Sequence, residues 1–190
     1  MDDGFIVPTR RKIDVDTLYR MLDAGIFYEG ERVELIDGEI IDMAPIGFDH
    51  AATVNTLHAT LVLACHGRAI VSGQNPVRVD TLNEPQPDFV VLRPRADNYR
   101  SAPRGGAEDA LLVIEVSDSS LRFDRAVKLP LYARAGFCEF WIVDLKRRVV
   151  TVYTDPSDGE YATVRTYRES ESIALSQAAD LVIPLAGIFG

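Results

Sequence analysis

Two acidic residues stand in segments that otherwise have the pattern of buried strands. Glu115 interrupts the apolar run "LLVIEVS" at residues 111–117, and Asp88 follows two prolines at the start of "DFVVL". A carboxylate is rarely buried without a partner, because removing its charge from water is costly. If the two strands pair antiparallel, the start of one lies beside the end of the other. The carboxylates of Asp88 and Glu115 would then meet at one rim of a sheet.

Two neighbouring carboxylates repel each other unless one takes a proton or a cation lies between them. Mg²⁺ prefers oxygen ligands and often uses one or two protein carboxylates, with water and phosphate completing its shell. We therefore expect Asp88 and Glu115 to hold Mg²⁺ or Mn²⁺. In the alternative, Glu115 faces water or pairs with an arginine. The apolar neighbours Ile114 and Val116 disfavour a wet face, because they indicate a strand covered on both sides.

Three elements are predicted in the first third of the chain. They are a helix over residues 13–25, a hairpin over 32–43 and a long amphipathic helix over 49–67. Asp14 or Asp16 can cap the first helix and Asp49 the second, while Asp37-Gly38 suits the tight turn of the hairpin.

The rest of the chain predicts mostly strands with one more helix. Strands are expected at 69–80, 87–94, 110–117, 139–145, 149–155, 160–167 and 181–190, and a helix at 119–136. This order indicates an α+β (α/β) fold with a mixed central β-sheet flanked by helices. No linker or internal repeat divides residues 1–190, so we expect a single domain.

Composition narrows the function classes. The net charge of −9 argues against a protein that coats nucleic acid through a broad positive field. Residues 93–106 are locally basic, with Arg93, Arg95, Arg100 and Arg104. We interpret this segment as a solvated loop or, alternatively, as a local surface that holds phosphates.

The sequence also predicts the cellular compartment of the protein. No run of 18 apolar residues predicts a membrane span, and the N-terminus lacks the apolar core of a signal peptide. Cys65 and Cys138 lack a CxxC partner, and we interpret them as reduced core residues. These features predict a cytoplasmic protein without a membrane partner.

Several stretches together resemble a known family. "QPD" is followed by "LLVIEVSDSSLRFDRAVKLPLYARAGFCEFWIVDL", and "VELIDGEIIDMAP" precedes His50. This ordered set resembles the Uma-two family of restriction-endonuclease-like proteins, within the PD-(D/E)XK nuclease superfamily. The resemblance covers roughly residues 13–154. It implies a core of a helix, three strands, a helix and a fourth strand, and metal-assisted cleavage of phosphodiester bonds in DNA. It also implies a homodimer, because cutting the two strands of DNA suits two sites.

The resemblance also implies roles for individual residues. Asp88 matches the D of the PD motif and Glu115 the (D/E), but Ser117 stands where the superfamily has lysine. Lys128, in the following helix, is the candidate for the missing ammonium. Its alternative is an ordinary surface pair with Asp124 four residues earlier.

Two further residues are candidates for the site. Glu34 is a possible third acid near the metal, and His50 could touch a phosphate or water from the start of its helix, since helix N-termini favour anions. Either could instead have a structural role. His50, His58 and His66 are eight residues apart, which does not suit a zinc site.

These features favour a Mg²⁺-dependent endonuclease that hydrolyses phosphodiester bonds of DNA. Asp88 and Glu115 would hold the metal, with Lys128, Glu34 and His50 as further catalytic candidates. A second hypothesis is a catalytically inactive nuclease-like domain that binds nucleic acid or protein partners, which Ser117 and the acidic total favour. A third is a hydrolase of small phosphodiesters or RNA.

Overall fold

A computed structural model describes residues 10–28, 30–100 and 105–190. Its centre is a six-stranded sheet in the order β3-β4-β5-β6-β7-β8. These strands are β3 (Ile70–Gly73), β4 (Phe89–Leu92), β5 (Ala110–Ser117), β6 (Glu139–Asp144), β7 (Val149–Ser157) and β8 (Glu160–Arg168). All neighbours are antiparallel except β5 and β6, so the sheet is mixed, as predicted.

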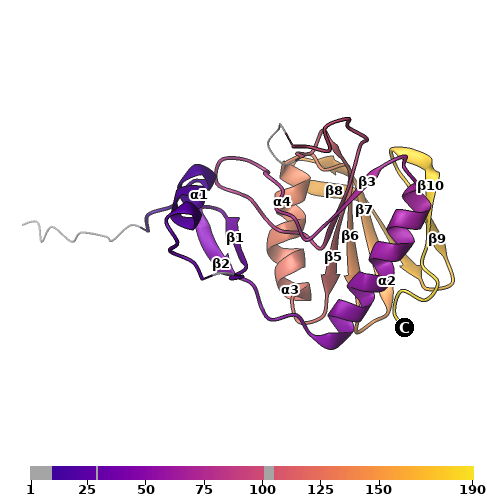
Figure 1. Ribbon diagram of the computed structural model, residues 1–190. Helices are drawn as coiled ribbons and strands as arrows, with labels where there is room; N and C mark the ends of the chain where they lie inside the picture. The colour runs from indigo at the N-terminus through magenta and orange to yellow at the C-terminus, as the bar shows by residue number, and fades with distance from the viewer. Residues whose placement is uncertain (1–9, 29, 101–104) are drawn as a thin grey trace, which may run out of the picture.

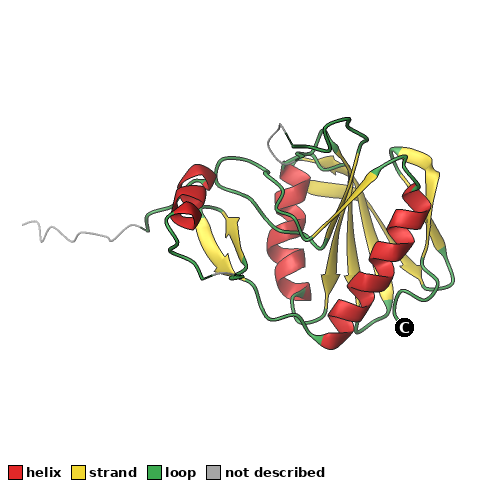
Figure 2. Ribbon diagram, viewed as in Figure 1, coloured by secondary structure: helices red, strands yellow, loops and turns green. Residues whose placement is uncertain are grey.

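The parallel pair depends on a helical crossover. Parallel strands cannot be joined by a tight turn, so the chain must cross one face of the sheet between β5 and β6. It does so through a continuous helical segment of three parts: α3 (Leu121–Phe123), a π-helical turn η1 (Asp124–Lys128) and α4 (Leu129–Arg134). Figures 1 and 2 show this segment beside the sheet.

Helices cover both faces of the sheet (Figure 2). One face packs against α2 (Phe48–Cys65) and the hairpin of β9 (Ser172–Leu175) and β10 (Ala178–Pro184). Alternate residues of β5 divide between two cores: Leu112 and Ile114 lie in the cluster with α2, whereas Val113 lies in the cluster with Tyr132 of α4. Because side chains alternate along a strand, Glu115 belongs to the α4 face.

The N-terminal helix and hairpin form an added unit beside the sheet (Figure 1). It contains α1 (Val15–Asp23), β1 (Val33–Ile36) and β2 (Glu39–Asp42), with Asp37 and Gly38 in the left-handed region at φ 50° and 71°. Leu35 of β1 exchanges two backbone hydrogen bonds with Glu84, at 2.8 and 3.3 Å. These bonds attach the hairpin to the segment that leads into β4.

The fold class is confirmed, but some local predictions were wrong. Gly47, not Asp49, is the N-cap residue of α2. The predicted strand over 69–80 ends at Gly73, and β9 was not predicted. Cys65 is a free core residue, whereas Cys138 is free but only partly buried. Within the described ranges, no helix is long and apolar enough to cross a membrane.

Candidate active site

Asp88 and Glu115 meet at one rim of the sheet, as the sequence predicts. Strands β4 and β5 are antiparallel with Phe89 opposite Ile114, so Asp88 lies opposite Glu115 one step further along. The prolines before Asp88 explain why β4 begins here, since they cannot donate to the ladder. The backbone N–H of Val116 donates to Oδ2 of Asp88 at 2.8 Å, which fixes the carboxylate against the end of β5.

Glu115 is buried and has two side-chain donors. Its exposed fraction is 4%, and Oε1 accepts a hydrogen bond from Lys128 Nζ at 2.9 Å and from the Tyr132 hydroxyl at 3.1 Å. Both donors come from the helical crossover, which packs on the same face of the sheet. The buried charge is therefore matched by an ammonium and a phenol; no arginine pairs with it among the described residues.

Lys128 joins two acids from distant parts of the chain. Its Nζ lies 2.7 Å from Oε1 of Glu34 as well as 2.9 Å from Glu115, and the side chain is 4% exposed. Glu34 also accepts the backbone N–H of Gln86 at 2.9 Å. An ammonium has three N–H donors, so one remains for a group in the adjoining cavity.

The predicted alternative, a surface pair between Lys128 and Asp124, is wrong. Asp124 is buried and its Oδ2 accepts the hydroxyls of Ser117 and Ser120, both at 2.7 Å. The helix adopts a π turn here, in which the N–H of Leu129 bonds to the carbonyl of Asp124. Pro130, which has no N–H and would clash with a carbonyl one α-turn earlier, then lies in the first turn of α4, which begins at Leu129, and does not break the segment. Within this π turn both Asp124 and Lys128 are buried.

His50 lies in the first turn of α2 and reaches Asp88. Its Nε2 is 3.2 Å from Oδ2 of Asp88, and Gln74 Nε2 donates to Oδ1 of the same carboxylate at 3.4 Å. The hydrogen bond with Asp88 raises the pKa of His50 despite partial burial. Burial raises the pKa of Asp88, but its bonds to His50 and Val116 outweigh this and lower it. The pair therefore favours an imidazolium beside a carboxylate.

Glu115 has a raised pKa, because its charged form is unfavourable in this site. Burial is the main cause that raises its pKa, and the neighbouring acids Asp124, Asp88 and Glu34 add to it against the attraction of Lys128. Burial lowers the pKa of Lys128, but Glu115 and Glu34 outweigh it and raise the pKa, so the ammonium stays charged. Carboxylates outnumber cations at this point, which is an arrangement that a bound cation relieves.

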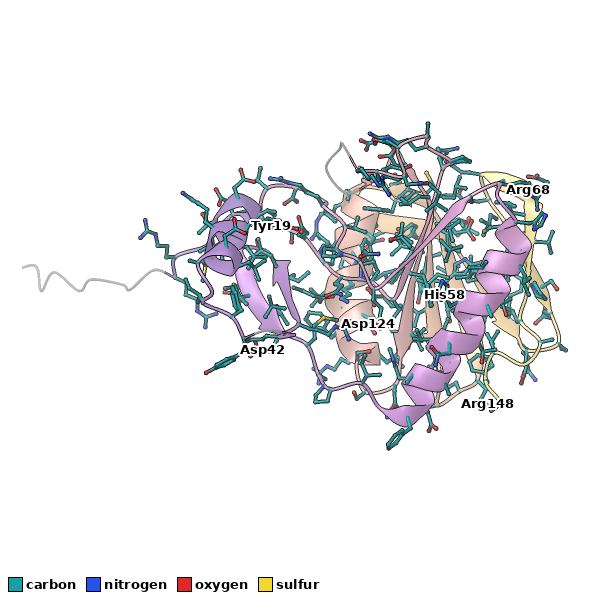
Figure 3. The ribbon with its side chains drawn as sticks, in the orientation of Figure 1. Tyr19, Asp42, His58, Arg68, Asp124 and Arg148 are labelled. Atoms are coloured by element: carbon teal, nitrogen blue, oxygen red, sulfur yellow. The ribbon has the colours of Figure 1, made fainter. Side chains whose placement is uncertain are left out.

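All five predicted site residues line one cavity of about 400 Å³. They are Glu34, His50, Asp88, Glu115 and Lys128. The cavity opens between the hairpin, the start of α2 and the helical crossover. Figure 3 labels two further acids that line it, Asp42 at the end of β2 and Asp124 in η1.

Among the residues that line this cavity there is none from the described part of the basic segment, residues 93–100 and 105–106, so its predicted role in holding phosphates is not part of the cavity itself. Arg93 follows Leu92, which pairs with Ala110 at the start of β5, about 16 Å along the strand from Glu115. Arg93 bonds to Gln177, and Arg95 pairs with Asp97 at 2.9 Å. Arg104 lies outside the described residues.

The donor set fits a hard divalent cation. Within the described residues, no group of three or more His, Cys, Asp or Glu side chains is arranged to hold a metal ion. Mg²⁺ does not need such a cage, because one or two carboxylates with water and phosphate suffice. Asp88 and Glu115 supply two carboxylates, and Oε2 of Glu115 has no hydrogen-bond donor among the described residues.

Several residues of the site were not among the predicted ones. Tyr132 is one helical turn after Lys128, a spacing that places both on one face. Arg32, just before β1, lines the cavity together with Glu34 of that strand. Asp124 and Ser117 pair with each other at the place where the superfamily has its lysine. Only the tertiary structure shows that these residues converge.

Comparisons with known proteins agree with this fold. A search of curated proteins finds no match. One similar solved structure is described as a putative nuclease belonging to DUF820 from Anabaena variabilis ATCC 29413; it is 16% identical, with a TM-score of 0.71 over 93% of this chain and 97% of that chain. That likeness confirms the restriction-endonuclease-like fold. Residues 15–186 match the model of the Uma2 family, which is described as "Putative restriction endonuclease". The chain therefore belongs to the Uma2 family.

Proposed function

We propose that this chain is a divalent-metal-dependent endonuclease that hydrolyses phosphodiester bonds of DNA. The observation that carries the proposal is the meeting of Asp88 and Glu115 at one cavity with a buried, charged Lys128 on Glu115. A cation held by the two carboxylates would supply Lewis-acid polarisation of the phosphate and a bound water of lowered pKa.

The remaining residues would position groups around the phosphate. The third N–H of Lys128 is available to orient a water or to stabilise negative charge that develops on phosphate oxygens. Tyr132 would hold Glu115 in place, and Glu34 would hold Lys128. His50, at the N-terminus of α2, would offer its imidazolium and the positive end of the helix to a phosphate. In the reaction, water adds to phosphorus, one P–O ester bond breaks, and the leaving oxygen takes up a proton.

The test is nicking of a supercoiled plasmid with Mg²⁺ or Mn²⁺, beside the Glu115→Ala and Asp88→Ala variants. We expect nicking by the parent protein and its loss in both variants. Activity that survives in Glu115→Ala would contradict the proposal. Tyr161→Phe is a matched control, because its hydroxyl bonds to the Phe137 carbonyl, away from the residues of the cavity.

A noncatalytic binding domain is the competing hypothesis, favoured by Ser117 in place of the motif lysine. Thermal unfolding distinguishes the two. Metal that binds the folded state raises the unfolding temperature, and the gain should disappear in Asp88→Ala and Glu115→Ala. No change in the parent protein on addition of Mg²⁺ or Mn²⁺ would favour the binding domain. Light scattering would test the predicted homodimer. Cleavage of an RNA oligonucleotide, measured beside nicking of the plasmid, would test the hypothesis of an RNA or small-phosphodiester hydrolase.

A further inference from the structure

We propose that the site takes unpaired DNA, with one phosphate over the carboxylates and an unstacked base against the apolar wall of the cavity. This inference rests on the proposed function and names its substrate class. It depends on three features of the described residues: the composition of the cavity wall, the charge of the lining, and the place of the basic segment.

Part of the cavity wall is apolar. The chain between β2 and α2 lines it with Met43, Ala44, Pro45 and Ile46, and Phe123 of α3 adds an aromatic ring. Ile46 is 46% exposed, and Phe48, next to the lining residue Gly47, is 95% exposed. Flat apolar and aromatic surface beside a phosphate site suits an unstacked base, because every base has a face that can stack. Paired bases inside a duplex do not present that face.

The charge of the lining disfavours a duplex. Among the residues that line the cavity, six are acidic and three are basic, and one of these three, His50, is paired with Asp88. Lys128 is already shared between Glu34 and Glu115, which leaves Arg32 as a lining cation with no ion pair to any described residue. Proteins that bind duplex DNA neutralise many phosphates on two backbones, and their affinity falls steeply with salt. Here Arg32 and His50 can neutralise about one or two phosphates beyond those that a bound metal would meet, far fewer than a duplex presents.

The basic segment does not compensate for this. Its described part follows β4 at the end opposite Asp88, where Arg93 bonds to Gln177 and Arg95 to Asp97, while Arg100 is exposed and lies outside the cavity lining. Affinity for DNA at the cavity would therefore come largely from contact with bases. A single strand, a loop or a frayed end offers those bases without the cost of opening a helix.

The experiment compares cleavage of three fluorescein-labelled DNAs of one sequence with Mn²⁺: a single strand, its blunt duplex, and a duplex with an internal unpaired loop. We expect the single strand and the loop to be cut at least about tenfold faster than the blunt duplex, the factor that one stacked base can supply. A duplex cut as fast as the single strand would overturn the inference and leave the proposed function intact.

Binding of a fluorescein-labelled oligothymidylate, without turnover in Ca²⁺, gives an independent readout. Phe123→Ala and Ile46→Ala should each weaken binding several-fold, whereas Val164→Ala, an exposed apolar residue of β8, should not. The slope of log affinity against log salt should be shallow, at about −1. Binding that depends on Phe123 without any cleavage would support the inference and contradict the endonuclease. Unchanged binding in both wall variants would overturn the inference.

Discussion

Glu34 and Lys128 are 94 positions apart in the chain and form an ion pair of 2.7 Å in the interior of the protein. The pair joins β1 of the N-terminal hairpin to the π turn of the crossover. Because Lys128 also bonds to Glu115, the hairpin takes part in placing the residues of the candidate site. The N-terminal unit is thus part of the candidate site, although its strands β1 and β2 form a separate sheet and are not among the six strands of the central sheet.

Removal of the Lys128 charge should strongly destabilise the protein. Lys128→Met leaves Glu34 and Glu115 buried without their shared cation, and breaking a buried ion pair costs about 3–5 kcal/mol. Urea unfolding measures the loss. A loss below about 1 kcal/mol would contradict the buried triad.

Two further variants make this test specific. Lys146→Met removes an exposed lysine 3.7 Å from Asp118 and should change the free energy of unfolding by no more than about 0.5 kcal/mol. Adding Glu34→Gln and Glu115→Gln to Lys128→Met removes all three charges and should recover part of the lost stability. If the triple variant is less stable than Lys128→Met alone, unpaired charge is not the cause of the loss.

Tyr132→Phe should reduce activity more than its effect on packing explains. The ring still fills its fully buried place, but Glu115 loses one of two donors, a bond to a charged group worth about 1.5–3 kcal/mol. We expect plasmid nicking to fall about tenfold. Tyr161→Phe, in the same aromatic cluster, should lose some stability and keep its nicking rate. Equal nicking rates for the two variants would show that Tyr132 contributes through the packing of its ring and that its hydrogen bond to Glu115 does not matter for activity.

The sequence predicted the parts of the site that depend on neighbouring residues. Prolines marked where β4 begins, and an acid inside an apolar run marked Glu115, so the meeting of Asp88 and Glu115 followed from antiparallel pairing. The direction of Lys128 did not follow, because an α-helical spacing placed it beside Asp124 while the real segment contains a π turn. The partnership with Glu34 is a contact between distant segments, which no local pattern encodes.

The His50–Asp88 pair should make stability depend on pH. The pKa of His50 is raised above its usual 6.5, so its contribution is fully present below pH 6.5 and is lost as pH rises through the folded-state value. The pKa of Asp88 is lowered from 3.8, so its contribution is present above that value and is lost as pH falls. In metal-free buffer the pair therefore stabilises the protein most between these two values.

Nuclear magnetic resonance of the histidine rings checks this directly. The His50 ring, assigned by its absence in His50→Gln, should titrate above 6.5 in the parent protein. In Asp88→Asn the hydrogen bond to a carboxylate is lost and partial burial remains, so the midpoint should fall. A midpoint that Asp88→Asn leaves unchanged would mean that another group sets the charge of His50.

A lysine at position 117 should substitute in part for Lys128. Ser117 is two residues after Glu115 in β5, so both side chains point to one face, and Ser117 Oγ already lies 2.7 Å from Asp124 of the π turn. An ammonium on a side chain from position 117 would extend toward the same acids that Lys128 now meets. Ser117→Lys combined with Lys128→Met should therefore nick plasmid at least about tenfold faster than Lys128→Met alone.

The matched control for this rescue is Ser117→Met combined with Lys128→Met, which adds a side chain of similar length without the charge. Ser117 is 1% exposed, so both double variants carry the same packing cost, and the comparison of their nicking rates isolates the ammonium. Urea unfolding should also show the lysine variant as the more stable of the two, because its charge lies near acids that have lost their cation. Equal nicking rates and equal stabilities would show that the site needs its ammonium from the π turn and that position 117 cannot supply it.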